Sequence, residues 1–365
     1  MGFQDFYGNS DAVQRIREML ARKRLPHALI LAGPPGAGKY TLAQMIAKAL
    51  NCLEPKIQGG LADFCGRCAN CTRIALADDL EARFAEAVEA REALRDADKK
   101  DTRIFVQTHP DVLIIPPDPP QMMIKVDQVR RVTETIYFRP GEGRERVYLF
   151  TDGAFLKEAA NALLKVLEEP PEFATLFLLV ENPGELLPTL RSRSITLTLA
   201  ALPPAEIEQL LAKKRPQWSA AQRALVARLS GGAVGAALAF DLERHTAACQ
   251  DALTLLTTAV RGEEHSALFK VTEAYRAGAE GKAKTDALLR AFYSLLEDLL
   301  FVKSGTPELV RNRDLAAALA RLAESVDFPW IAAAAQRADE VQAGMRRNLL
   351  RSLSLDALVA SLERG

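Results

Sequence analysis

Residues 28–39 read ALILAGPPGAGK, an apolar run that leads into a glycine-rich turn ending on a lysine. The apolar run predicts a buried strand, and Leu42, Ile46 and Leu50 recur after the turn at the spacing of a helix. A strand, a glycine-rich turn and a helix in this order form the context of a P-loop, whose backbone N–H groups surround phosphate oxygens at a helix N-terminus. The stretch therefore predicts an α/β fold, and the predicted phosphate ligands are Gly33, Gly36, Gly38 and Lys39.

The residue after Lys39 departs from the P-loop pattern. The full signature has Ser or Thr there, whose hydroxyl binds Mg²⁺, but this chain has Tyr40. The hydroxyl of Tyr40 lies at the end of a long ring, and Thr41 lies about 100° further around the helix. We therefore expect at most weak binding of ATP or ADP through Lys39 and the loop amides.

The second half of an ATPase site is also altered. Active P-loop ATPases carry a carboxylate for Mg²⁺ at the end of a neighbouring strand. Here the expected strand Val147–Phe150 is followed by Thr151, and only Asp152 remains. A single Asp after a strand is either a metal ligand or, as we favour, a turn-capping residue. Both alterations predict a chain without ATP hydrolysis of its own.

Four of the five cysteines are close together in the sequence, namely Cys52, Cys65, Cys68 and Cys71. Four thiolates can complete a tetrahedral shell around a structural zinc ion, which leaves no position for a catalytic water. Free cysteines are common in protein cores, but the two successive Cys-x2-Cys spacings favour the metal. The sequence thus predicts a zinc module at about residues 52–71, and Cys249 is expected to be a core residue.

The spacing of apolar residues divides the rest of the chain into an α/β part and a helical part. Strands are expected at Val112–Ile115, Val147–Phe150 and Thr175–Val180, and helices from Ser10 or Asp11, around Val126–Ile136 and through Ala159–Leu167. Strands that alternate with helices predict a parallel sheet flanked by helices, up to about Leu199. Beyond it only helical periodicity remains. We predict an α/β domain at 1–200, a small helical lid at 201–240 and an all-α domain at 241–365.

A charged stretch from Asp78 to Lys100 follows the cysteines. Its apolar residues Leu80, Phe84 and Val88 recur every four positions, which predicts a solvated helical insertion. We interpret this insertion as a surface decoration.

The composition excludes several classes of protein. Lys+Arg and Asp+Glu both number 47, whereas a protein that holds DNA by itself usually carries a basic excess. No apolar run reaches the ~18 residues that a membrane span needs, and the first residues lack the apolar centre of a signal peptide. We expect a cytoplasmic protein that shares any nucleic-acid role with other subunits.

Several stretches together resemble the bacterial clamp-loader subunits, which are of the AAA+ type. They are residues 33–39, the four-cysteine module and the segments His109–Val112, Val126–Arg130, Asn161–Lys165, Leu167–Pro171 and Ser192–Ser194. The resemblance covers residues 3–240, and it implies that residues 241–365 form the oligomerising collar of this family. The implied partners are the clamp-loader delta and gamma/tau subunits in a heteropentamer and, through that complex, the sliding clamp and primer-template DNA.

This family contains ATP-hydrolysing motor subunits of the gamma/tau type and a non-hydrolysing type, delta-prime. Three departures favour the second type: Tyr40 in place of Thr, Thr151 in place of the first acid, and Gly235 in place of a sensor arginine. The resemblance thus implies a stator subunit of the DNA-directed DNA polymerase III holoenzyme. It would take part in ATP-dependent loading of the sliding clamp onto primed DNA during replication.

Ser192-Arg193 resembles the motif that, in this family, projects an arginine across an interface into the ATP site of a neighbour. Such an arginine finger stabilises charge on the transferring phosphoryl group and is worth ~10³–10⁵ in rate. An isolated arginine here would be interpreted as the ion-pair partner of a carboxylate. Within the motif, the implied role of Arg193 is that of a finger acting in trans.

Two alternatives remain open. The first is a motor-type clamp-loader ATPase that hydrolyses ATP despite Tyr40. The second is a zinc-containing, DNA-binding relative of these ATPases that acts outside replication. The residue after Lys39 argues against the first, and the balanced charge argues against the second.

Overall fold

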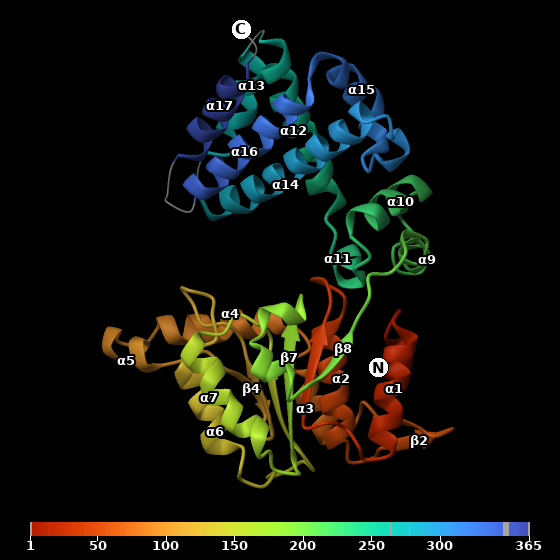
Figure 1. The fold of residues 1–365 in the computed structure, drawn as a ribbon, viewed down its shortest axis with the longest axis vertical. Coiled ribbons are helices and arrows are strands. Elements are labelled where there is room, and N and C mark those ends of the chain that lie inside the picture. Colours follow the sequence, from red (N-terminus) through yellow and green to blue (C-terminus); the bar gives the residue numbers. More distant parts are fainter. Residues whose placement is uncertain (1, 263–264, 277, 346–349, 364–365) are drawn as a thin grey trace. The chain divides into compact units, whose positions relative to one another are not determined.

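The computed structural model describes residues 2–262, 265–276, 278–345 and 350–363 (Figure 1). The chain forms two compact units. The first comprises Met1–Ile207 and Gly231–Leu238, and the second comprises Glu208–Ser230 and Ala239–Gly365. The terminal residues Met1 and Gly365, which bound the predicted domains, lie outside the described residues. The division into three domains stays a prediction.

A six-stranded sheet forms the centre of the first unit, in the order β4-β5-β6-β7-β1-β8. Its strands are β1 (Ala28–Ala32), β4 (Val106–His109), β5 (Val112–Ile115), β6 (Arg146–Phe150), β7 (Ala174–Val180) and β8 (Ile195–Thr198). Strand β1 pairs in parallel with both β7 and β8, so the strand that precedes the glycine-rich turn lies inside the sheet. The predicted P-loop α/β fold is confirmed.

The sheet differs from the prediction at one edge. Strand β4 pairs antiparallel with β5, and the other pairs are parallel. Only Pro110 and Asp111 separate β4 from β5, and two residues can join antiparallel neighbours only. The short, polar residues 106–109 carry little apolar periodicity, so the sequence did not indicate this strand.

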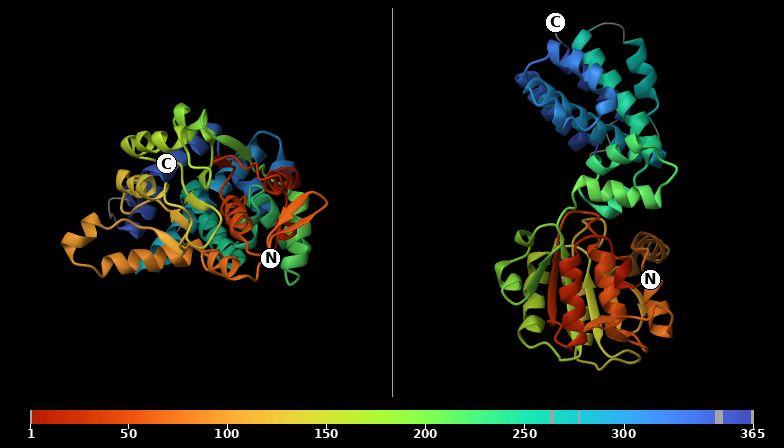
Figure 2. Two further views of the ribbon diagram at one scale, coloured as in Figure 1. Left: turned by 90° about the horizontal axis from the view of Figure 1, so that it is seen from below. Right: turned by 90° about the vertical axis from the view of Figure 1, so that its right-hand side faces the viewer.

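Helices cover both faces of the sheet (Figures 1 and 2). One face carries α1 (Ser10–Ala21), α2 (Lys39–Asn51) and α3 (Ala69–Ala75); the other carries α6 (Val126–Thr135), α7 (Lys157–Glu168) and α8 (Pro188–Arg191). Successive strand residues point to opposite faces. Accordingly Leu29 and Leu31 pack with α2, while Ile30 packs with α6 and α7.

The cysteine module contains a two-stranded hairpin, β2 (Lys56–Gln58) and β3 (Leu61–Asp63). Its turn is Gly59-Gly60, with φ angles of 58° and 77°. Positive φ at both central residues is the requirement of a tight hairpin turn, which glycine meets without strain.

The charged stretch forms α4 (Leu80–Glu92) and α5 (Asp96–Asp101), so the helical prediction is confirmed. Its interpretation as a surface decoration is wrong in one respect. Arg91 is only 8% exposed, and its guanidinium lies 3.1 Å from the carboxylate of Asp118, which is fully buried. Helix α4 is thereby anchored to the α/β unit.

The remaining elements of the first unit are short or lie at its end: 3₁₀ turns at Phe3–Asp5 and Pro183–Glu185, helix α11 (Val234–Leu238) and the first residues of α9 (Pro204–Lys214).

None of the helices in the described part of the chain combines the length and the apolar character that crossing a bilayer requires.

The described residues of the second unit form helices and short 3₁₀ turns. Its helices are α10 (Ala220–Leu229), α12 (Leu242–Arg261), α13 (Ser266–Glu273), α14 (Gly278–Lys303), α15 (Ala316–Ser325), α16 (Phe328–Met345) and α17 (Arg351–Leu362). Apolar residues of α12 and α14, such as Leu255, Leu288 and Leu295, form the centre of one core. Cys249 lies in this core, as predicted.

Candidate functional site

The P-loop ends where α2 begins, at Lys39. Gly36 and Gly38 have φ angles of 77° and 90°, which L side chains rarely adopt. The ammonium group of Lys39 donates hydrogen bonds to the carbonyls of Gly33 (2.5 Å) and Pro34 (2.9 Å). The predicted phosphate-binding lysine therefore lies against its own loop. Burial lowers the pKa of Lys39, although nearby carboxylates act in the opposite direction.

Tyr40 points away from the loop. Its hydroxyl donates to the carbonyl of Ala77, two residues after the end of α3, and accepts a hydrogen bond of 2.9 Å from the amide of Gln44. Thr41 is exposed. Neither hydroxyl is therefore placed where a P-loop Ser or Thr would bind Mg²⁺.

Helix α11 lies directly on the P-loop. The N–H of Gly235 donates to the carbonyl of Gly36 at 2.8 Å, and a Cβ added to Gly235 would lie 3.0 Å from that oxygen. A side chain at this position would require the backbone to shift. Gly235 thus allows a close backbone contact between α11 and the P-loop.

A cavity of about 640 Å³ opens beside the loop, lined by Lys39, Asp152, Glu181 and Glu185 among other residues. Asp152 accepts a hydrogen bond of 2.8 Å from the N–H of Ala154, as a turn-capping residue does. Three carboxylates facing one lysine make the cavity net negative. This charge disfavours a triphosphate unless a cation accompanies it.

Arg193 lies between α8 and β8, with 36% of its side chain exposed. Its Nη2 is 2.9 Å from the carboxylate of Glu168, the last residue of α7, and its Nη1 donates to the carbonyl of Thr189 at 3.1 Å. In the isolated chain, the guanidinium is therefore ion-paired within its own subunit.

The four predicted zinc ligands lie together. The Sγ atoms of Cys52, Cys65, Cys68 and Cys71 are all within 4.8 Å of one another. Backbone N–H groups donate to three of them, including the bonds from Cys65 to the sulfur of Cys52 (3.2 Å) and from Leu53 to that of Cys68 (3.4 Å). Burial acts to raise the pKa of Cys68, but the hydrogen bonds to its sulfur outweigh it and lower the pKa to about 6. Clustered thiols in such surroundings fit a tetrahedral thiophilic metal ion.

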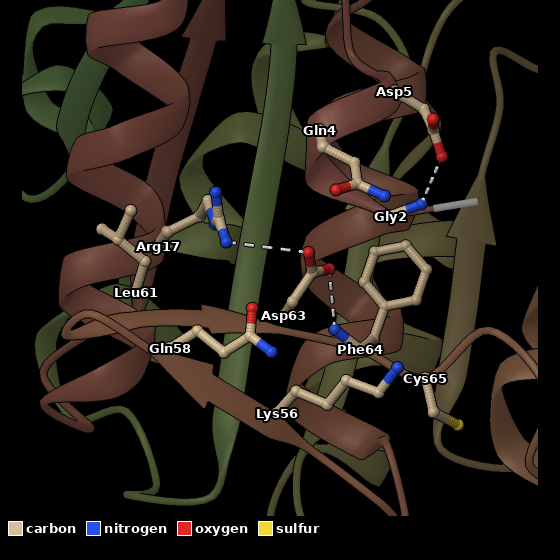
Figure 3. A pocket seen from close by; sticks show the side chains of 10 residues that line it. All are labelled: Gly2, Gln4, Asp5, Arg17, Lys56, Gln58, Leu61, Asp63, Phe64 and Cys65. Carbon is tan, nitrogen blue, oxygen red and sulfur yellow. Dashed lines mark hydrogen bonds and ion pairs between the residues drawn. The ribbon is translucent and has the colours of Figure 1, made fainter.

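The N-terminal segment closes one side of this module (Figure 3). The carboxylate of Asp63 accepts from the N–H groups of Phe3 (3.2 Å) and Phe64 (2.9 Å), and Arg17 lies 3.7 Å from it. The rings of Phe3 and Phe64 meet edge to face. A small polar cavity of about 240 Å³ remains between the segment and the hairpin.

The comparisons with known proteins agree on a family. The model of the family described as "DNA polymerase III, delta subunit" matches residues 8–203, more than half of the chain. This chain belongs to that family. The matched residues include the P-loop, the four cysteines and Arg193.

Individual relatives carry two different names. The chain is 35% identical to DNA polymerase III subunit delta' of Escherichia coli K12 over 216 residues, which cover 58% of this chain and 54% of that protein. It is 30% identical to subunit tau/gamma of Haemophilus influenzae over 211 residues, which cover 58% of this chain and 25% of that protein. The chain thus spans about half of one relative and a quarter of the other.

A solved structure is also similar, that of a gamma subunit-related protein of Thermotoga maritima. It covers 94% of this chain and 96% of its own, at 17% identity. The TM-score between the two structures is 0.35.

The family motif His109-Pro110-Asp111 has a structural role in this chain. The buried carboxylate of Asp111 accepts hydrogen bonds of 2.8, 2.9 and 2.7 Å from the N–H groups of Gly141, Glu142 and Gly143. Asn70 in α3 donates to the carbonyl of Glu142 at 3.4 Å, which connects this loop to the cysteine module. Sequence reasoning missed these contacts, although the glycines on both sides of Glu142 are a signal for a loop that surrounds a carboxylate.

Proposed function

We propose that this chain is the delta-prime subunit of a bacterial DNA polymerase III clamp loader, a cytoplasmic subunit that hydrolyses no ATP. It takes part in ATP-dependent loading of the sliding clamp onto primed DNA. The observation that carries the proposal is Tyr40. This residue follows the P-loop lysine, where a motor subunit needs a magnesium ligand, but its hydroxyl is directed away and donates a hydrogen bond to the carbonyl of Ala77. The 35% identity to the delta' subunit of Escherichia coli is compatible with it, although the delta' subunit of Pseudomonas aeruginosa and the tau/gamma relative are both 30% identical.

Steady-state ATP hydrolysis by the isolated chain tests this proposal. We expect no turnover above background, with or without Mg²⁺, and no change in Lys39→Ala. Turnover that Lys39→Ala abolishes would establish the alternative, a motor of the gamma/tau type.

We propose that Arg193 completes the ATP site of a neighbouring motor subunit. Its ion pair with Glu168 is partly exposed, and such pairs contribute about 0.2–1 kcal/mol, so phosphate oxygens can compete for the guanidinium. In a reconstituted loader, Arg193→Ala should lower ATPase and clamp loading partially, because only one of several sites loses its finger. Arg191→Ala is the matched control, since Arg191 is an exposed arginine two residues away. Equal rates in both variants and the natural loader would contradict the proposal.

We propose that the cysteine cluster holds one structural zinc ion. Metal analysis of the purified chain should find about one zinc per chain. Replacing Cys68 and Cys71 by Ser should remove it, whereas Cys249→Ala, in the other unit, should not. A metal-free natural chain of full stability would exclude the site.

The proposed partners are the delta and gamma/tau subunits of a heteropentamer, and the clamp and primer-template DNA are reached through that complex. We propose that residues 241–365 form the collar that holds the chain in the ring. Their core of buried leucines shows why this part folds, and the assembly role is tested by truncation, as described in the Discussion.

A further inference from the structure

Three contacts hold the guanidinium of Arg193 in the isolated chain. Nη2 lies 2.9 Å from the carboxylate of Glu168, and Nη1 donates to the carbonyl of Thr189 at 3.1 Å and to the hydroxyl of Ser192 at 3.5 Å. Because these contacts engage both Nη1 and Nη2, they determine the orientation of the guanidinium plane as well as its position. A guanidinium has five N–H donors in a fixed fork. These contacts leave the N–H of Nε and one N–H of Nη2 for an external acceptor.

The platform under these contacts is rigid. Glu168 ends α7, and Pro170 and Pro171 prevent the helix from continuing, which fixes the backbone from which its side chain extends. Thr189 belongs to α8, and the buried Leu190 packs α8 into the same core as α7. A long, half-exposed arginine would otherwise sample many rotamers at the surface.

We propose that Glu168 is a positioning residue for Arg193: its carboxylate holds the guanidinium in the orientation in which it meets a phosphate of the neighbouring site. This inference rests on the proposed role of Arg193 in trans. Holding a charged donor in place before the reaction lowers the cost of organising it in the transition state. Because the pair is half-exposed and weak, it orients the arginine without preventing contact with phosphate.

Four variants in a reconstituted loader separate orientation from charge. Glu168→Ala removes the acceptor, and Glu168→Gln keeps an acceptor oxygen without the charge. Glu169→Ala is the matched control: Glu169 is the adjacent exposed glutamate and has no ion pair in the part of the chain that the structure describes. The double variant Glu168→Ala/Arg193→Ala tests whether both residues act through one contact.

The measurement is single-turnover ATP hydrolysis in a loader in which only the motor site facing this chain is active. We expect Glu168→Ala to lose on the order of tenfold, because a misplaced group costs rate even when it is present. Glu168→Gln should stay within about twofold of the natural chain, Glu169→Ala should match it, and the double variant should equal Arg193→Ala. Ring assembly and thermal stability should be the same in all variants.

The possible failures are distinguishable. If Arg193→Ala is itself without effect at this site, the proposed finger is wrong and the positioning role goes with it. If Arg193→Ala loses activity but Glu168→Ala does not, or if the double variant loses more than Arg193→Ala, only the positioning role is wrong. A Glu168→Gln variant as impaired as Glu168→Ala would also overturn it, since charge would then matter and orientation would not.

Discussion

At the residue scale, Tyr40 stands where the full P-loop signature has Ser or Thr, and its hydroxyl makes structural contacts. This hydroxyl connects α2 to Ala77, in the segment that follows α3. The amide of Gln44, a residue that is 1% exposed, depends on the same hydroxyl for a hydrogen bond. The tyrosine therefore packs against the core that supports the P-loop helix.

Tyr40→Phe is expected to destabilise the α/β unit by about 1–2 kcal/mol, because buried polar groups lose their partner. Hydrogen exchange in urea should measure this change, since both tryptophans, Trp218 and Trp330, lie in the other unit and do not report on this one. Tyr137→Phe is the matched control, because Tyr137 is 55% exposed. Equal stability of the two variants would contradict the structural role.

Asp111 provides a pH-dependent test at the same scale. Burial acts to raise the pKa of its carboxyl, but the three backbone N–H bonds outweigh it, so the pKa is lowered in the folded chain. A lowered folded pKa stabilises the fold above the unfolded value of about 4, and this contribution is lost as the pH falls through the folded pKa. Asp111→Asn should cost about 2 kcal/mol at neutral pH. Urea unfolding of both proteins should show the difference shrinking below about pH 4; a difference that does not change with pH would contradict this account.

At the scale of elements, ion pairs attach the insertion of α4 and α5 to the rest of the α/β unit. Asp118 accepts from Arg91 of α4 and from the N–H of Ile104 (3.0 Å), and Lys125 lies 2.8 Å from its second oxygen. At the other end of the insertion, Lys48 of α2 lies 2.6 Å from the carboxylate of Asp78. The insertion is thus held at its first residue, Asp78, and near the end of α4, at Arg91.

Arg91→Ala is expected to destabilise the α/β unit by about 3 kcal/mol, because it leaves a buried carboxylate with one charged partner fewer. Arg83→Ala on the same helix is the control. Its partner Glu86 is 56% exposed, and such pairs contribute about 0–1 kcal/mol. Hydrogen exchange of β4 and β5 should report the difference, and similar values for both variants would show that the buried pair is dispensable.

At the scale of the whole molecule, the chain contains two units with separate cores. The division is not a simple cut in the sequence, since Gly231–Leu238 belongs to the first unit and Glu208–Ser230 to the second. Within the second unit, Arg228 of α10 donates to the carbonyl of Arg311. Helix α10 therefore folds with residues that follow it at a distance along the chain.

A chain that ends at residue 240 should keep the α/β unit and its zinc but should not join the loader. It retains the sheet and the cysteines, whereas the core of α12 and α14 is absent. Size-exclusion chromatography with the partner subunits measures assembly, and metal analysis confirms that the α/β unit is folded. Normal assembly of this truncated chain would exclude the collar role.

Local sequence patterns were sufficient to predict several elements of this fold. The strand, glycine-rich turn and helix of residues 28–51 were predictable because buried strands and amphipathic helices have distinct periods and glycine marks the turn. The clustering of the four cysteines was predictable from their spacing, because they are close in the chain. Strands β4 and β8 were missed because they are short, edge-located and largely polar or exposed.

Tertiary structure alone decided the partners of the functional side chains. The contacts of Tyr40 with Ala77, Arg91 with Asp118 and Arg193 with Glu168 join residues 37, 27 and 25 positions apart. No periodicity relates such positions, because each contact depends on where whole helices pack against the sheet. The sequence by itself determined which residues are candidates for the proposed phosphate, metal and trans contacts. Only the fold determined what each of them touches in this chain, because a side chain's partner is set by the packing of distant segments and not by its neighbours in the sequence.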